Sequence, residues 1–189
     1  MRHKYATAAI VLARSSAGED STLVTLLTHD LGLVRVRAQG LRKPGAKLAA
    51  SLQTLSESDV ILVRGKDGWR LSGAVLGDNH FQAMEHSARL RAGRVAGLVL
   101  RLVAGEAADA ALYATLKGFL SFLAARPLEE HDAAECLAAL RILHILGLDA
   151  GELGSLATDS YSVEELSAVA SGRSTIIARI NRGLAASGL

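Results

Sequence analysis

Positive charge is the chemical property that this sequence concentrates most clearly in one short stretch. The seventeen residues from Leu31 to Lys47, LGLVRVRAQGLRKPGAK, carry five arginine or lysine side chains and no acidic residue. Apolar and polar residues alternate from Val34 to Gln39, which is typical of a strand with one buried and one exposed face. On that pattern Arg35 and Arg37 share the exposed face, and Gly40 ends the strand. A cationic strand face that leads into a cationic loop suits a polyanion such as nucleic acid.

A solvated strand face followed by a charged turn would give the same pattern, so the alternative stays open on these residues alone. Few aromatic side chains are available to stack on bases, because residues 1–79 offer only Tyr5 and Trp69. Trp69 is expected in the core, since it shares a strand face with Leu71 and Val75. Phosphate contacts would then hold a nucleic-acid strand without reading its base sequence. This leaves the bases free to pair with a complementary nucleic-acid strand. The candidate nucleic-acid-binding residues are Arg14, Arg35, Arg37, Arg42, Lys43, Lys47, Arg64 and Lys66.

The remaining reactive residues do not form a catalytic or metal-binding pattern. His80 and His86 are six positions apart, and His131 and His144 are thirteen apart, so neither pair has the i, i+4 spacing of two ligands on one helix face. Cys136 is the sole cysteine, which excludes a disulfide framework and a cysteine-based zinc site, and we expect it to be a buried small hydrophobe. The sequence has no G-x-S-x-G elbow and no Walker loop. We therefore expect no enzymatic activity, no metal and no other cofactor.

Composition and charge agree with a globular chain that has one basic end. Half of the 189 residues are hydrophobic, and 4% are aromatic, so an aliphatic core is expected. Residues 1–80 carry 11 Lys and Arg against 7 Asp and Glu, whereas residues 126–189 carry 5 against 9. The longest apolar tract, Val95 to Ala104, is interrupted by Arg101 and is too short to span a bilayer. The apolar run near the N-terminus is also too short for a signal peptide, so we expect a cytoplasmic protein.

The hydrophobic pattern changes period near residue 80, which predicts two domains. Before it, a short helix is predicted over 46–52, a hairpin turn at 65–68, and strands over residues 5–13, 21–28, 34–39, 58–64 and 69–76. Three strands, a short helix and a two-stranded hairpin are the order of an OB-fold, a small barrel that often binds oligonucleotides. The fold class is therefore predicted as α+β, with a five-stranded OB-fold barrel over residues 1–79 and an all-helical domain over 80–189.

Helices are predicted beyond residue 80 over 81–103, 109–125, 132–146, 162–170 and 174–186. Two capping boxes are predicted, Asp132 with Glu135 and Ser162 with Glu165, and Ser174 is predicted to cap the last helix. Gly147 is expected to end the third of these helices. The last helix is also expected to carry a small basic patch formed by Arg173, Arg179 and Arg182.

Several ordered segments resemble the RecO family of recombination mediators. They are a first strand ending IVLAR, the turn Gly18-Glu19-Asp20, the segment LVTLLTHDLGLVRVRAQGLRKPGAKLAASLQ, and LRILHILGLDAG in the helical half. The sequence departs from the family pattern at Ala46, where members often carry serine, and at Thr54, where they often carry proline. Residues 151–160 also replace the four-cysteine zinc module that many members have at this point. A bound zinc ion is therefore not expected in that region.

The resemblance implies an N-terminal OB-fold that binds single- and double-stranded DNA, followed by a helical domain. It implies a mediator of recombinational DNA repair that anneals strands and loads a recombinase, and that is cytoplasmic and associated with the nucleoid. The implied partners are DNA, a RecR-type mediator protein and the C-terminal tail of single-strand binding protein, with no membrane. The basic residues of 31–47 match the DNA-contacting region of the family. Two other classes stay open: an OB-fold protein that binds RNA or ribosomal components, and a non-enzymatic adaptor that acts through its helices.

Overall fold

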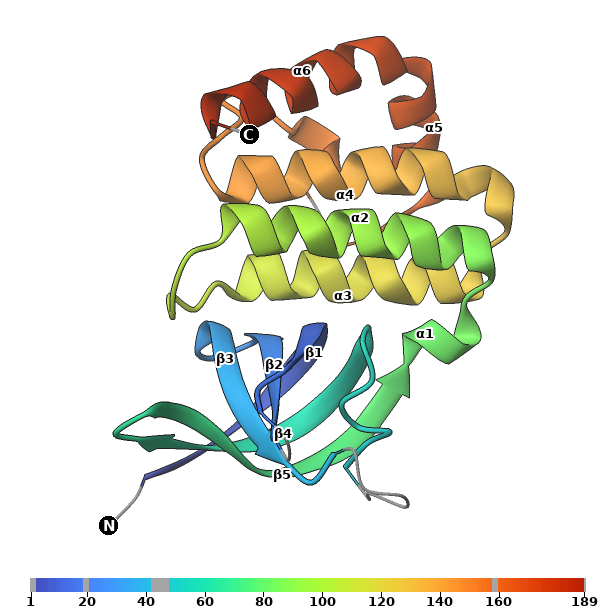
Figure 1. The fold of residues 1–189 in the computed structure, drawn as a ribbon. Helices are drawn as coiled ribbons and strands as arrows, with labels where there is room; N and C mark the ends of the chain where they lie inside the picture. Colours follow the sequence, from blue (N-terminus) through green and yellow to red (C-terminus); the bar gives the residue numbers. More distant parts are fainter. Residues whose placement is uncertain (1–2, 19–20, 42–47, 158–159, 189) are drawn as a thin grey trace. The chain divides into compact units, whose positions relative to one another are not determined.

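The computed structural model describes residues 3–18, 21–41, 48–157 and 160–188 (Figure 1). The chain forms two compact units. The first, here called the barrel unit, contains residues 1–83 together with 104–110. The second, the helical unit, contains residues 84–103 and 111–189.

Five strands form the barrel unit: β1 (Lys4–Ser16), β2 (Ser21–Thr28), β3 (Gly32–Gln39), β4 (Ser56–Gly65) and β5 (Gly68–Asn79). They close into a barrel in the order β1-β2-β3-β5-β4 (Figure 1). All neighbouring strands are antiparallel except β3 and β5, which run parallel and close the barrel at the pairs Val36–Trp69 and Arg37–Arg70. This strand order confirms the predicted OB-fold.

The barrel core follows the alternation predicted for β3. Val34, Val36 and Ala38 are buried, whereas Arg35 and Arg37 are exposed. The buried side chains join one cluster that contains Leu26, Leu52, Leu62 and Trp69, among others. Burial of Trp69 agrees with its predicted place in the core.

The predicted position of Val75 beside Trp69 in the core is wrong, because β5 contains a bulge. Ile61 pairs with Gly73, whereas Leu62 pairs with Leu71, so Ser72 is an extra residue in β5. An extra residue reverses the alternation of the side chains that follow it. Ala74 therefore packs against the core cluster, and Val75 is 69% exposed.

Residues 104–110 belong to the barrel unit although they follow the first long helix in the chain. The backbone N–H of Leu33 donates to the carbonyl oxygen of Gly105 at 3.3 Å. Gly32 has a φ of +73°, and a Cβ there would collide with the backbone of Ala107. Glycine is therefore required at position 32 both by its backbone conformation and by this close approach.

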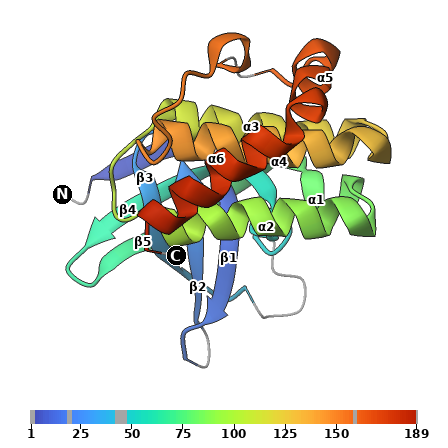
Figure 2. The same ribbon diagram turned by 90° about the horizontal axis from the view of Figure 1, so that it is seen from above.

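Five longer helices make up the helical unit: α2 (His86–Leu102), α3 (Ala110–Ala125), α4 (His131–Ile145), α5 (Val163–Ser171) and α6 (Arg173–Ala186). Two short 3-10 helices, η1 (Leu128–Glu130) and η2 (Gly154–Leu156), lie in the connections. Helix α4 contacts α2, α5 and α6 and is the centre of the packing (Figures 1 and 2). No helix among the described residues is long and apolar enough to cross a membrane.

The predicted helix over 81–103 is divided in two. A single turn, α1 (His80–Ala83), ends before Met84 and Glu85, and α2 begins at His86. The helix predicted over 46–52 lies partly outside the described residues, and the described part, 48–52, forms turns.

The helix ends test the predicted caps. Ser162 and Glu165 form the predicted capping box of α5. Gly147 ends α4 as predicted, with a φ of +71° and a 2.8 Å bond from the N–H of Leu148 to the carbonyl of Leu143. The Asp132 cap is wrong, because α4 begins at His131 and Asp132 lies inside its first turn. The Ser174 cap is also wrong, because α6 begins at Arg173 after Gly172, without a side-chain cap.

Candidate nucleic-acid interface

The outer face of β3 carries two arginines with free guanidinium groups. Arg35 and Arg37 alternate with buried valines and point away from the core. Neither forms a hydrogen bond or ion pair with another residue that the structure describes. Their charge is therefore available to a ligand.

Strand pairing extends this charge across the barrel surface. Arg37 of β3 pairs with Arg70 of β5, Arg70 pairs with Val63 of β4, and Val63 pairs with Lys4 of β1. Directly paired residues point to the same side of a sheet, so these side chains form one transverse row. We call the exposed cations of this surface the outer band, which consists of Lys4, Arg35, Arg37 and Arg70.

The outer band places like charges next to each other, and no residue that the structure describes forms an ion pair with them. Arginines directly opposite in two strands repel each other, and this repulsion destabilises the pair. Arg37 and Arg70 are nevertheless paired at the strand contact that closes the barrel. A polyanion bound on this face would remove the repulsion, because each phosphate would neutralise one cation.

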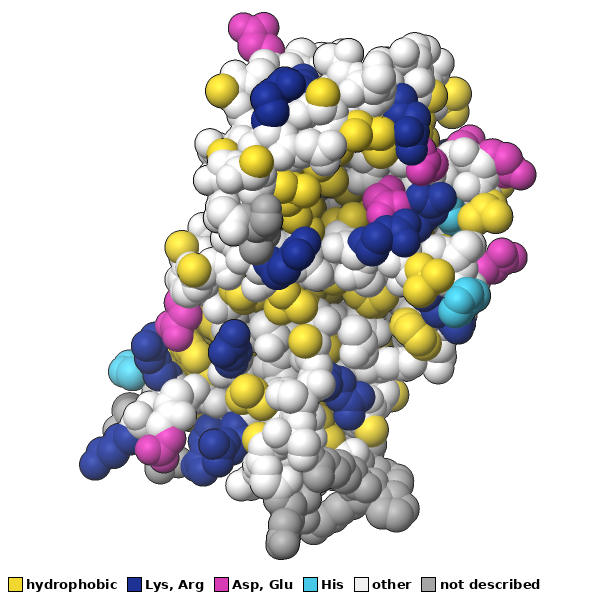
Figure 3. All heavy atoms as spheres, turned by 45° about the horizontal axis from the view of Figure 1, so that its top comes forward, with side chains coloured by type: hydrophobic (Ala, Val, Ile, Leu, Met, Phe, Trp, Pro, Cys, Tyr) yellow, Lys and Arg dark blue, Asp and Glu magenta, His cyan; other side chains and the backbone are white. Residues whose placement is uncertain are grey.

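A hollow at the β4–β5 hairpin adds a further cation beside the outer band. Residues 63–68 and Arg70 line a cavity of about 480 Å³. Lys66 lies at the exposed tip of the hairpin. Lys and Arg side chains gather around this end of the barrel unit in Figure 3, with acidic side chains among them, and Asp67 lines the hollow as well. In an OB-fold, this hairpin is one of the loops that contact oligonucleotides.

Arg64, in the same hairpin, has a different environment. Its guanidinium donates to Glu106 at 2.6 Å and lies 5.2 Å from the ring centroid of Trp69. The indole Nε1–H of Trp69 donates to the other carboxylate oxygen of Glu106 at 2.9 Å. Glu106 therefore neutralises Arg64 and ties residues 104–110 to the barrel. Arg64 has a structural role here that the sequence-based prediction did not assign.

The structure does not place all of the predicted binding residues on the same face of the barrel. Arg14 pairs with Val24 of β2, whereas Arg35 and Arg37 pair with the residues on either side of Val24. Because alternate residues face opposite sides of a sheet, Arg14 does not share the outer face. Arg42, Lys43 and Lys47 lie outside the described residues.

Lys4 and Arg70 are members of the outer band that sequence reasoning missed. The alternation Trp69-Arg70-Leu71 signals an exposed arginine. Its place beside Arg37 could not be read from the sequence, because it depends on the parallel pairing of β3 with β5.

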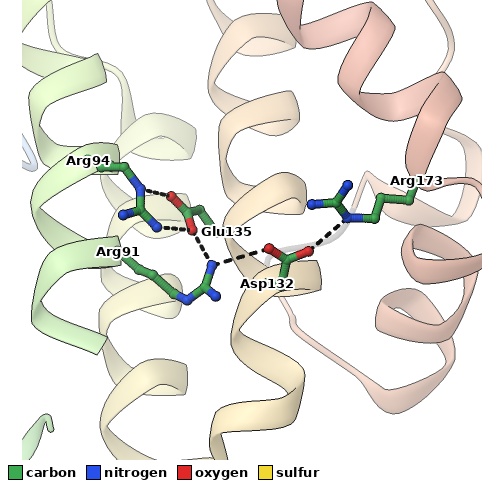
Figure 4. A network of polar contacts seen from close by, with 5 residues as sticks. All are labelled: Arg91, Arg94, Asp132, Glu135 and Arg173. Carbon is green, nitrogen blue, oxygen red and sulfur yellow. Dashed lines mark hydrogen bonds and ion pairs between the residues drawn. The ribbon is translucent and has the colours of Figure 1, made fainter. Parts of the chain in front are cut away.

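Arginines of the helical unit are held by carboxylates instead. Figure 4 shows Glu135 of α4 accepting from Arg91 and Arg94 of α2, at distances between 2.5 and 2.7 Å. Asp132 accepts from Arg173 at 2.9 Å and from Arg91 at 3.4 Å. The hydrogen bond from Arg173 is the main reason that the pKa of Asp132 lies below its usual value. These contacts link α2, α4 and α6.

Two further pairs complete this pattern. Arg179 donates to Asp149 at 2.5 and 3.1 Å, which lowers the pKa of that carboxyl group. Arg141 is 2% exposed and donates to Glu165 and to the carbonyls of Leu156 and Ser160, at 2.6 to 2.7 Å. The predicted basic patch of α6 is therefore largely neutralised, since Arg173 and Arg179 are both paired with carboxylates.

Cys136 is only partly buried, in contrast to the prediction. Burial nevertheless raises the pKa of its thiol, with the nearby Asp132 carboxylate as a second cause. The thiol is therefore protonated at neutral pH and has low nucleophilicity.

Comparison with known proteins assigns the barrel unit to a family. The strand order defines this part of the chain as an OB-fold. Residues 1–76 match the family model described as Recombination protein O N terminal. By this match, the N-terminal part of the chain belongs to the RecO family.

Curated relatives share this assignment. The chain is 41% identical over 64 residues to the DNA repair protein RecO of Dehalococcoides mccartyi, which covers 34% of this chain and 25% of that protein. It is 38% identical over 92 residues to the protein of the same name from Synechococcus elongatus. This match covers 49% of this chain and 35% of that protein. A longer match, 28% identical over 149 residues, covers 78% of this chain and 51% of the Cyanothece protein. The chain thus matches a quarter to about half of the length of these relatives.

Proposed function

We propose that this chain acts in recombinational DNA repair by binding the phosphate backbone of single- and double-stranded DNA on the outer band. The observation that carries the proposal is the pairing of Arg37 with Arg70 on one exposed face, without a described carboxylate partner. Support also comes from the name of the relatives, DNA repair protein RecO. No enzymatic step is part of this proposal.

The geometry of the band favours contacts with phosphates over contacts with bases. Arg35 and Arg37 are two residues apart on one strand, which places their Cα atoms about 7 Å apart. Trp69 is buried, and Tyr5 packs its ring edge-on against Trp69 with centroids 5.2 Å apart. Trp69 is therefore not available to stack on a base, and Tyr5 is the one partly exposed ring of the described barrel strands. DNA held in this way keeps its base edges accessible, so a second strand can pair with it.

Strand annealing and loading of a recombinase are the activities that we propose for DNA bound in this way. The partners we propose are a RecR-type mediator protein and the C-terminal tail of single-strand binding protein. An annealing assay with two complementary oligonucleotides tests the first activity. Annealing should be faster with the protein than without it, and equal rates would contradict the proposal.

The binding test is fluorescence anisotropy of a labelled single-stranded oligonucleotide at several salt concentrations. We expect log K to fall against log salt with a slope between about −2 and −3, because each neutralised phosphate contributes about −0.7. Replacing both Arg37 and Arg70 with glutamate should weaken binding by at least about tenfold for each residue, since hydrogen bonds to charged groups contribute about 1.5–3 kcal/mol.

Arg126→Glu is the control for each single replacement, Arg37→Glu or Arg70→Glu, because it makes the same charge change at an exposed residue of the helical unit. It should leave the affinity within a factor of about two, since it lies off the outer band and surface changes have small effects. A loss for Arg126→Glu as large as the loss for Arg37→Glu or for Arg70→Glu would mean that net charge alone governs binding. Unchanged binding by the double variant, with the fold intact by circular dichroism, would contradict a site on the outer band.

Competition with structured RNA separates DNA from the alternative polyanion. Unlabelled single-stranded DNA should displace the labelled oligonucleotide at lower concentration than a structured RNA of equal length. Preferential displacement by RNA would favour an RNA-binding OB-fold. Absence of binding to either at low salt would favour an adaptor that acts through its helices.

A further inference from the structure

Three potential metal ligands meet where β4 begins and β5 ends. The β4–β5 hairpin joins the other ends of these two strands. Glu57 lies near the start of β4, Asp78 near the end of β5, and His80 is the first residue of α1. One ligand atom from each residue lies within 4.8 Å of the other two. All three belong to the barrel unit.

An irregularity in the β4–β5 pairing brings these residues together. Ser56 pairs with Asn79 and Ser58 pairs with Leu76, so Glu57 faces two residues of β5 instead of one. One of them is Gly77, where a Cβ would lie 3.3 Å from the carbonyl oxygen of Glu57. A bulge of this kind redirects the side chains next to it. Here it places Asp78 beside Glu57 and lets the chain turn directly into α1.

Burial makes this cluster different from a group of surface carboxylates. His80 is 4% exposed and Glu57 is 8% exposed, whereas Asp78 lies at the surface. Transfer of a charged group out of water is costly, so a cation bound beside the buried carboxylate of Glu57 would offset part of that cost. The Nε2 atom of His80 and Oε2 of Glu57 are 4.0 Å apart, which is beyond hydrogen-bond distance.

The spacing fits an ion between the three side chains. Zinc binds histidine nitrogen and carboxylate oxygen at about 2.0–2.2 Å, so two ligand atoms in a tetrahedral site lie about 3.4 Å apart. The 4.0 Å separation of His80 and Glu57 therefore needs only a small movement of either side chain. The exposed position of Asp78 leaves room for water at a fourth ligand position.

We propose that Glu57, Asp78 and His80 form a binding site for a divalent transition-metal ion, with Zn²⁺ as the best-fitting species. The imidazole nitrogen favours Zn²⁺ over Mg²⁺ and Ca²⁺, which prefer oxygen ligands. An ion at this point joins the start of β4, the end of β5 and α1. It stabilises the barrel unit near residue 83, after which the chain continues into the helical unit. The site shares no residue with the proposed DNA contacts.

The test uses the full chain without an affinity tag, stripped of metal with a chelator. We expect calorimetric titration with Zn²⁺ to show one equivalent bound at the micromolar level or tighter. Co²⁺ should give the visible absorption of a site with nitrogen and oxygen ligands. Saturation with Zn²⁺ should raise the midpoint of thermal unfolding by about 4 °C or more, because a ligand that binds only the folded state stabilises it.

Asp78→Asn is the most informative variant, because Asp78 is exposed and its replacement does not disturb the core. It should weaken Zn²⁺ binding at least tenfold while the circular dichroism spectrum of the metal-free protein stays unchanged. Glu57→Gln should do the same and tests the buried ligand. His86→Ala is the control, since His86 is exposed and lies outside the cluster.

Two results would overturn the proposal. One is the absence of Zn²⁺ and Co²⁺ binding by the metal-free protein. The other is one equivalent of Zn²⁺ bound with unchanged affinity by Asp78→Asn and Glu57→Gln, which would place the ion on other residues. Loss of binding in His86→Ala alone would have the same meaning.

Discussion

The barrel unit and the helical unit use arginine in different ways. On the outer band, Arg35, Arg37 and Arg70 have no described partner and lie on a face that no described carboxylate neutralises. In the helical unit, Arg141 and Arg179 each bind a carboxylate that is less than a tenth exposed. Arginine therefore stabilises packing in the helical unit, as Arg64 does at Glu106 of the barrel unit, whereas the arginines of the outer band remain available to a ligand. Charge composition alone does not distinguish these roles, whereas the position of the carboxylates does.

The largest effect that this comparison predicts is on the stability of the helical unit. Arg141→Ala should lower the free energy of unfolding by about 3–5 kcal/mol, because Glu165 would remain as an uncompensated buried charge. Urea denaturation followed by far-ultraviolet circular dichroism measures this loss. Fluorescence of Trp69, the only tryptophan, reports the barrel unit in the same samples. A loss below about 1 kcal/mol would contradict a structural role for this pair.

A second, smaller effect depends on pH. The bond from Arg179 lowers the pKa of Asp149 in the folded chain. A carboxyl group with a lowered folded pKa contributes stability above its unfolded pKa of about 3.9, and this contribution is lost as the pH falls through the folded value. Asp149→Asn should therefore be less stable than the natural sequence at neutral pH, and the difference should shrink below about pH 4. A difference that stays constant down to pH 2 would contradict this assignment.

The smallest effects are expected for exposed arginines in both units. Arg173→Ala removes a pair whose side chains are 53% and 45% exposed, so we expect a much smaller loss of stability than for Arg141→Ala. Arg35→Ala should change stability by no more than about 0.5 kcal/mol, because no described contact is lost. Thermal unfolding of both variants measures these changes. A marked loss for Arg35→Ala would mean that the outer band stabilises the barrel, and the contrast between the units would fail.

Local pattern was sufficient to predict the parts of the fold that depend on neighbouring residues. Alternation identified β3 and its exposed arginines, and the Ser162–Glu165 spacing identified the start of α5. Both signals lie within a few positions of the structure that they specify. The order of strands and turns likewise predicted the OB-fold.

Features that depend on tertiary contacts could not be predicted in the same way. Asp132 and Glu135 have the spacing of a capping box, but arginines of α2 and α6 compete for these carboxylates. The bulge at Ser72, which exposes Val75, has no clear mark in the sequence. Spacing between histidines did not indicate the cluster at His80, because its two other members are the carboxylates of Glu57 and Asp78. Glu57 lies on β4, more than twenty positions before His80 in the sequence.

The contribution of residues 104–110 to the barrel has a consequence for folding during synthesis. The five strands leave the ribosome before Glu106, which lies 37 positions after the Trp69 that it binds. The barrel therefore cannot complete its contacts until the whole of α2, a helix of the other unit, has also been made. Contacts between distant positions form late. The hydrogen bond from Trp69 to Glu106 therefore cannot form until translation has passed Glu106. A fragment cut after residue 83 would lack that partner permanently, and would leave the N–H of Leu33 without the carbonyl of Gly105.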